Sequence, residues 1–162
     1  MKFKDIPGQI ETALHLREMA NNNRLGHALL FLSKEGTGAL SLALAFSQYL
    51  VCEKRKSIFQ PKNNALFGEE ILDELTTGEF PDDSCGECPS CIRAQQFIHP
   101  DIHFSYPVIP KKSGVKPTSA DFGSGWKEFL SATPYGNVFD WLQFIGAENQ
   151  QGNITAEECM DI

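Results

Sequence analysis

Four cysteines have the residue type and the spacing of a metal site. Cys85, Cys88 and Cys91 follow one another at two-residue gaps in the run Cys-Gly-Glu-Cys-Pro-Ser-Cys. Such gaps let thiolates converge on one ion, and tetrahedral zinc takes four ligands that are typically thiolate or imidazole. Cys52, at the end of an apolar helical segment, is the natural fourth ligand. The sequence therefore predicts a structural Zn²⁺ bound by all four, inside a module of about residues 52–98.

Three other interpretations of these cysteines stay open from the sequence alone. His99 or His103 could replace Cys52 as the fourth ligand. An iron–sulfur cluster is the second alternative, although Gln95 stands where ferredoxin-type runs carry their close fourth cysteine. The third is that these are ordinary reduced cysteines in a core. Because four cysteine ligands leave no open coordination position, we expect the metal to be structural rather than catalytic.

A glycine-containing turn is the second place where chemistry is possible. A working phosphate loop reads G-x-x-x-x-G-K-[ST], in which the Lys reaches the β- and γ-phosphates and the hydroxyl binds magnesium. Here Gly36, Thr37 and Gly38 stand between a predicted strand and a predicted helix. Ala39 falls where the Lys is needed, and Leu40 falls where the Ser or Thr is needed. Without those two groups we expect no ATP binding and no catalysis at this degenerate loop.

The elements that must position these residues are predicted to alternate between helix and strand. Apolar periodicity predicts helices over residues 9–21 and 39–51. The unbroken apolar run 28–32 predicts a strand buried on both faces, and apolar alternation predicts a second strand over 101–109. Strand, turn and helix in this order predict an α/β fold with a parallel sheet flanked by helices.

The rest of the chain is predicted from shorter patterns. Residues 54–83 are typical of an irregular insertion, and residues 111–124, rich in Pro, Gly, Lys and Ser, are typical of a loop. A capping box at residues 155–158 opens a last helix that has barely begun where the sequence stops. Short helices are predicted over residues 69–75, 92–98, 126–130 and 138–145.

Composition limits the classes of function. The 162 residues are 41% hydrophobic and 22% charged, which is typical of a globular domain with a core. The net charge of −7 argues against non-specific binding of nucleic acid, because phosphates require clustered Lys and Arg. No apolar run is long enough to cross a membrane and no signal-peptide core begins the chain, so we expect a cytoplasmic protein.

The order of these features resembles that of bacterial DNA polymerase III clamp-loader subunits. Residues 3–9, Phe-Lys-Asp-Ile-Pro-Gly-Gln, are similar to the start of those subunits, and residues 27–31 to their first strand. The glycine turn stands where their phosphate loop stands, and the four cysteines match their inserted zinc module. His99-Pro100-Asp101 resembles the segment that follows that module.

The resemblance implies an AAA+-like P-loop NTPase domain with an inserted zinc module. Residues 1–162 would then be its N-terminal part, truncated, without the lid and collar domains. In that family the gamma and tau ATPases keep the Lys and Thr of the loop, whereas delta-prime subunits often do not use ATP. Ala39 and Leu40 make this chain similar to delta-prime.

A delta-prime-like chain would be a non-catalytic subunit that joins gamma/tau and delta in loading the sliding clamp onto primed DNA. It would have no membrane partner and would meet DNA through the complex. A gamma/tau-like ATPase with a degenerate loop is an alternative, and so is a free-standing zinc-binding interaction module. The gap between Cys52 and Cys85 is longer than is typical of the family.

Overall fold

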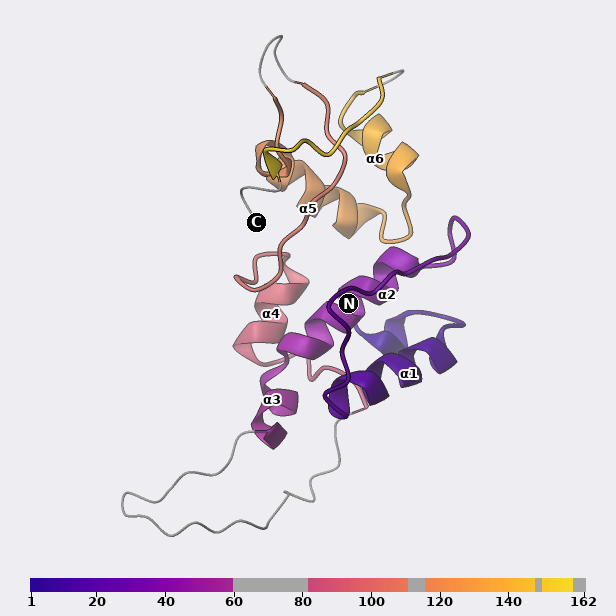
Figure 1. Cartoon of the computed structure of the whole chain (residues 1–162), viewed down its shortest axis with the longest axis vertical. Coiled ribbons are helices and arrows are strands. Elements are labelled where there is room, and N and C mark those ends of the chain that lie inside the picture. Colours follow the sequence, from indigo (N-terminus) through magenta and orange to yellow (C-terminus); the bar gives the residue numbers. More distant parts are fainter. Residues whose placement is uncertain (60–81, 111–115, 148–149, 159–162) are drawn as a thin grey trace, which may run out of the picture. The chain divides into compact units, whose positions relative to one another are not determined.

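The computed structural model describes residues 1–59, 82–110, 116–147 and 150–158. Within these ranges the structure is helical (Figure 1), and its one β-pairing is an isolated antiparallel bridge between Val108 and Asn153. The predicted α/β fold with a parallel P-loop-type sheet is therefore wrong for this part of the chain. None of the helices described is long and apolar enough to cross a bilayer.

The two predicted strands are irregular segments. Residues 28–32 join no sheet among the described residues, and the side chains of Leu30 and Leu32 are 87% and 88% exposed. Residues 101–109 contribute only Val108, whose N–H and C=O exchange hydrogen bonds of 3.1 and 3.0 Å with Asn153. A strand requires a neighbour that satisfies its backbone groups, and an apolar run does not supply one.

The chain divides into two compact units. The first, here the cysteine unit, comprises Met1–Leu29 and Leu42–Gln95. The second, here the aromatic unit, comprises Leu30–Ser41 and Gln96–Ile162. The cysteine unit holds all four cysteines of the predicted metal site, and the aromatic unit holds the glycine turn.

Within the described residues, four α-helices contribute to the cysteine unit. The helices predicted over 9–21 and 39–51 are confirmed as α1 (Ile10–Asn21) and α2 (Ala39–Val51). Helix α2 is rich in Ala and Leu, which are strong helix formers, and contains neither Gly nor Pro. Helix α3 (Glu53–Phe59) was not predicted, because this segment was assigned to the irregular insertion. Helix α4 (Pro89–Gln95) begins three residues earlier than expected, since proline is well suited to a first helical position.

The aromatic unit is built around α5 (Gly123–Ala132) and α6 (Val138–Phe144), which follow the 3₁₀ turn η2 (Ser119–Phe122). Another 3₁₀ turn, η1 (Phe3–Asp5), belongs to the cysteine unit. Both short helices predicted here are confirmed, although α5 begins inside the segment expected to be a loop. Trp141 is 1% exposed, and its indole N–H donates to the carbonyl of Pro107 at 2.7 Å. Its ring packs edge-on against Tyr106 and Trp126, at centroid distances of 5.1 and 4.9 Å.

Four of the predictions fall wholly or partly on residues that the structure does not describe, among them the irregular insertion expected over 54–83, of which residues 60–81 lie outside the described ranges. The helix expected over 69–75, part of the loop expected over 111–124, and the continuation of the last helix beyond residue 158 lie outside the described residues.

Candidate metal centre

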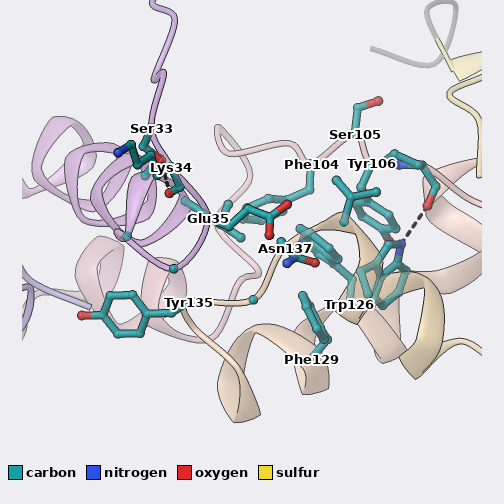
Figure 2. Close-up of a pocket in the computed structure, with 18 of the residues that line it drawn as sticks. Ser33, Lys34, Glu35, Phe104, Ser105, Tyr106, Trp126, Phe129, Tyr135 and Asn137 are labelled. Atoms are coloured by element: carbon teal, nitrogen blue, oxygen red, sulfur yellow. Dashed lines mark hydrogen bonds between the residues drawn. The ribbon is translucent and has the colours of Figure 1, made fainter.

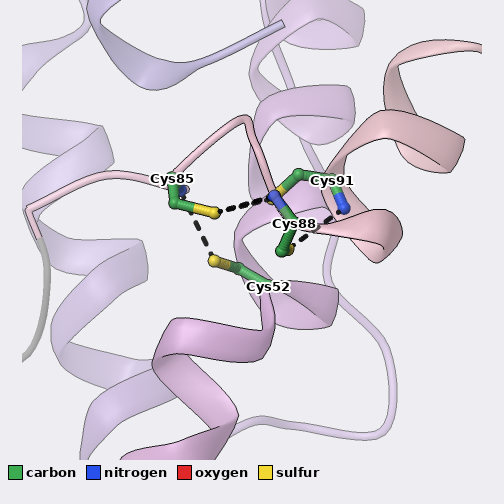
Figure 3. Close-up of side chains that lie close together, drawn as sticks. All are labelled: Cys52, Cys85, Cys88 and Cys91. Atoms are coloured by element: carbon green, nitrogen blue, oxygen red, sulfur yellow. Dashed lines mark hydrogen bonds between the residues drawn. The ribbon is translucent and has the colours of Figure 1, made fainter.

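The structure brings the four cysteine sulfurs to one point. The Sγ atoms of Cys52, Cys85, Cys88 and Cys91 all lie within 4.8 Å of one another (Figure 3), and all four thiols are free. The sulfurs of Cys85 and Cys91 are 3.8 Å apart. A tetrahedron with zinc–sulfur bonds of about 2.3 Å has edges of about 3.8 Å. The arrangement therefore has the ligand type, number and spacing that a structural zinc ion requires.

Backbone amides surround the sulfurs as hydrogen-bond donors. The N–H of Cys85 points to the sulfur of Cys52, that of Cys88 to Cys85, and that of Cys91 to Cys88, each at 3.4 Å (Figure 3). Gly86 takes φ = +78°, a left-handed conformation that turns the chain between Cys85 and Cys88, in the Cys85–Cys91 knuckle. Donors of this kind stabilise thiolates and orient metal ligands.

The pKa values of Cys85 and Cys91 show how closely placed thiols affect one another. Burial raises the pKa of the Cys85 thiol, but hydrogen bonds from the N–H groups of Glu87 and Cys88 outweigh it and bring the pKa to about 6. Burial raises the pKa of Cys91, and the neighbouring thiols of Cys88 and Cys52 raise it further. Sulfurs this close cannot all ionise without a positive charge between them. A coordinated divalent cation supplies that charge and deprotonates its thiols outright.

Cys52 is positioned by a buried polar network at the junction of three helices. It lies between the last residue of α2 and the first of α3 and is 0% exposed. The guanidinium of Arg55 donates to the carbonyl of Ala20 at 2.7 Å and lies 5.4 Å from the ring centre of Tyr49. The hydroxyl of Tyr49 donates to the side chain of Asn21 at 2.9 Å. These contacts fix the ends of α1 and α2, and with them the Cys52 sulfur.

A second contact joins α3 to the first turn of α4. The carboxylate of Glu53 accepts hydrogen bonds from the N–H and the hydroxyl of Ser90, at 3.2 and 2.9 Å. Glu53 follows Cys52 and Ser90 precedes Cys91, so this contact holds two cysteines from distant parts of the sequence side by side. Sequence reasoning missed both residues, although their adjacency to cysteines was a usable signal.

The two histidines considered as alternative ligands are not in the cluster. Among the described residues, the close group of metal-binding side chains around Cys52 consists of the four cysteines. His99 and His103 belong to the aromatic unit. His99 is buried, and its Nδ1 accepts a hydrogen bond from the N–H of Asp101 at 3.1 Å.

The glycine turn borders a cavity of about 490 Å³ within the aromatic unit. Figure 2 shows residues of the turn on one side and the side chains of Tyr106, Trp126 and Phe129 on the other. Ala39 and Leu40 line this cavity at the positions where a phosphate loop would carry its Lys and its hydroxyl. The next hydroxyl along the chain, that of Ser41, is buried and donates to the carbonyl of Pro134.

The turn itself is closed by its own side chains. The hydroxyl of Thr37 donates to the carbonyl of Lys34 at 2.7 Å, and that of Ser33 donates to the same carbonyl at 3.1 Å. Gly36 and Gly38 take φ values of +74° and +87°, which is the left-handed region that glycine adopts without strain. The turn thus satisfies its own hydroxyls and presents an apolar start of α2 to the cavity.

Comparison with known proteins gives one family. Residues 8–71 match the family model described as "DNA polymerase III, delta subunit". This stretch is less than half of the chain; it includes α1, the glycine turn and Cys52 and stops before the other three cysteines. The match supports a relationship to the DNA polymerase III clamp-loader family. No curated protein matches the chain, and no solved structure does.

Proposed function

We propose that this chain is a non-catalytic subunit of a DNA polymerase III clamp loader, of the delta-prime type, braced by a structural zinc ion. In this role it would assemble with the gamma/tau and delta subunits and help to place the sliding clamp on primed DNA. The observation that carries the proposal is the convergence of Cys52 with the Cys85–Cys91 knuckle, in a chain that matches the clamp-loader family model over residues 8–71.

The metal is proposed to brace the fold. Four sulfur ligands complete a tetrahedral shell, which leaves no position for a water or a substrate. The ion would join the end of α2 to the start of α4, which lie far apart in the sequence. Binding of zinc to such sites is worth about 10–16 kcal/mol in zinc-finger peptides, so the knuckle is expected to depend on its metal.

The absence of ATP chemistry is proposed from the composition of the turn. Ala39 and Leu40 place methyl and isobutyl groups where a positive charge and a magnesium ligand are needed, and Ser41 is committed to Pro134. The amides at the start of α2 could still attract an anion, but weakly without a lysine.

Three measurements on the full chain test the proposal. Metal analysis should find about one zinc per chain, and calorimetric titration with magnesium ATP should find no binding at micromolar nucleotide, where a gamma/tau subunit serves as positive control. Size-exclusion chromatography with the gamma/tau and delta subunits of the same organism should yield a joint complex. Micromolar, magnesium-dependent ATP binding would favour a gamma/tau-like ATPase instead, and failure to enter the complex would contradict the clamp-loader assignment.

A further inference from the structure

A lysine from the beginning of the chain reaches the cysteine knuckle. The ammonium of Lys2 donates a hydrogen bond to the backbone carbonyl of Cys85 at 2.7 Å, across 83 residues of sequence. The side chain is half-buried and belongs to the same compact unit as the knuckle. Neither the spacing of the cysteines nor any local pattern predicts this contact.

The knuckle has room for this side chain because residue 86 is glycine. A Cβ atom added at Gly86 would lie 2.6 Å from the Nζ atom of Lys2 and closer still to its Cε atom. Contacts this short do not occur, so a larger residue at position 86 would displace the lysine. Gly86 thus provides both the left-handed turn of the knuckle and the space for the end of the Lys2 side chain.

The backbone that follows Lys2 is fixed independently of the ammonium. The N–H groups of Phe3 and Lys4 donate to the carboxylate of Asp83 at 3.2 and 3.1 Å. The ring of Phe3 is buried and lies 5.7 Å from the ring centre of Tyr49. The chain therefore delivers the lysine to the knuckle from an anchored segment, which lowers the entropy cost of holding its charge there.

The charge of Lys2 suits a four-thiolate centre. Four thiolates around one Zn²⁺ leave two excess negative charges, and Glu53 adds another at the Ser90 end of the cluster. Arg55 interacts electrostatically with Cys52, but its guanidinium also donates to the carbonyl of Ala20. A half-buried ammonium beside Cys85 offsets part of this negative charge where solvent screens it poorly.

From this geometry we infer that Lys2 is a positioning residue for the metal centre, which holds the Cys85 carbonyl and offsets the negative charge of the bound four-thiolate site. The inference rests on the proposed zinc occupancy. It assigns to the N-terminal segment a part in metal retention that the four ligands alone do not reveal.

The test measures Zn²⁺ affinity of the full chain by competition with a chromophoric chelator. Lys2→Met keeps the aliphatic stem and removes the charge, and Lys4→Met removes the same charge from an exposed neighbour as the matched control. We expect Lys2→Met to weaken zinc affinity about tenfold, the lower end for residues that support metal ligands. Lys4→Met should leave the zinc affinity unchanged. Lys2→Arg keeps a positive charge and should therefore retain most of the wild-type zinc affinity.

Two further readouts separate a charge effect from a packing defect. The cobalt(II)-loaded Lys2→Met chain should keep the thiolate-to-cobalt absorption of the wild-type chain at saturation, because all four ligands remain. Its affinity deficit should shrink as salt rises, but less than the deficit for an exposed charge pair would, because salt screens a partly buried charge interaction only in part. Equal zinc affinity in Lys2→Met and wild type, or no recovery in Lys2→Arg, would overturn the role of Lys2. A wild-type chain that takes up no zinc would overturn the metal centre itself.

Discussion

Replacing Cys52 by serine tests the ligand that lies farthest in sequence from the other three. Cys52 is 0% exposed, and its sulfur accepts the N–H of Cys85 at 3.4 Å. A serine oxygen keeps an acceptor for that N–H, so the metal-free fold should change little, but a neutral hydroxyl is a far poorer zinc ligand. If four sulfurs share about 10–16 kcal/mol equally, the loss of one costs about 3 kcal/mol, or about 100-fold in affinity.

The loss of zinc affinity should also lower the free energy of unfolding, because zinc binds the folded chain and stabilises it. At a free zinc concentration of about 100 times the wild-type Kd, zinc stabilises the wild-type chain by about 2.7 kcal/mol. A Kd raised about 100-fold leaves about 0.4 kcal/mol, so Cys52→Ser should lower the unfolding free energy by about 2 kcal/mol in zinc-buffered urea titrations. Without zinc the two chains should unfold at similar urea concentrations.

The control for Cys52→Ser is His103→Gln, which removes the exposed histidine that the sequence left open as a fourth ligand. It should bind zinc as tightly as the wild type, because His103 lies in the aromatic unit and outside the cysteine cluster. The ligand assignment would be refuted if Cys52→Ser held zinc at wild-type affinity, and the histidine alternative would be revived if His103→Gln lost it.

Three more outcomes follow from the contacts described. Excess chelator should expose the amides of residues 84–91 to fast hydrogen exchange and leave α5 and α6 protected, because zinc-binding energy is local folding energy; equal deprotection of both units would contradict this. Trp141→Ala should lower the unfolding free energy of the aromatic unit by about 3–5 kcal/mol in urea melts, since it empties a buried site, and should not change zinc affinity. Burial, and then the charge of Glu158, raises the pKa of Tyr106 above its usual value, so the folded chain holds this proton more tightly than the unfolded chain. Stability should therefore be complete below about pH 10 and fall as the pH rises further; Tyr106→Phe should flatten that decline, though not abolish it, because burial also raises the pKa of Tyr49.

Local chemistry explains which features could be predicted from the sequence. Helix α2 follows from an uninterrupted Ala- and Leu-rich run, in which each residue favours the helix without help from distant partners. The convergence of Cys85, Cys88 and Cys91 follows from their two-residue gaps, because this spacing suits the tetrahedral coordination of zinc. The addition of Cys52 needed only the observation that a helix rich in apolar residues ended in a thiol.

The two strand predictions were wrong because a strand depends on a partner elsewhere in the chain. An apolar run such as residues 28–32 indicates a preference for burial, but a strand also requires a partner strand whose backbone groups face its own. Within the described residues the chain supplies one such pair, Val108 and Asn153, and leaves Leu30 and Leu32 exposed. The inference from apolar pattern to parallel sheet assumed partners that the pattern does not contain.

Helix α3 was missed in the sequence because its position depends on contacts with other helices, and these contacts also help to position the metal site. Its sequence opens Glu-Lys-Arg-Lys, and such a run of charges reads as a solvated segment. Arg55 is nevertheless 8% exposed, because its guanidinium caps the carbonyl of Ala20 at the end of α1 and stacks near Tyr49 of α2. A buried charge of this kind is stable only when its hydrogen bonds are made, so its position is determined by the ends of two other helices. Cys52 lies three residues before Arg55, and the sulfur is therefore located by a charged residue that no hydrophobic pattern could identify.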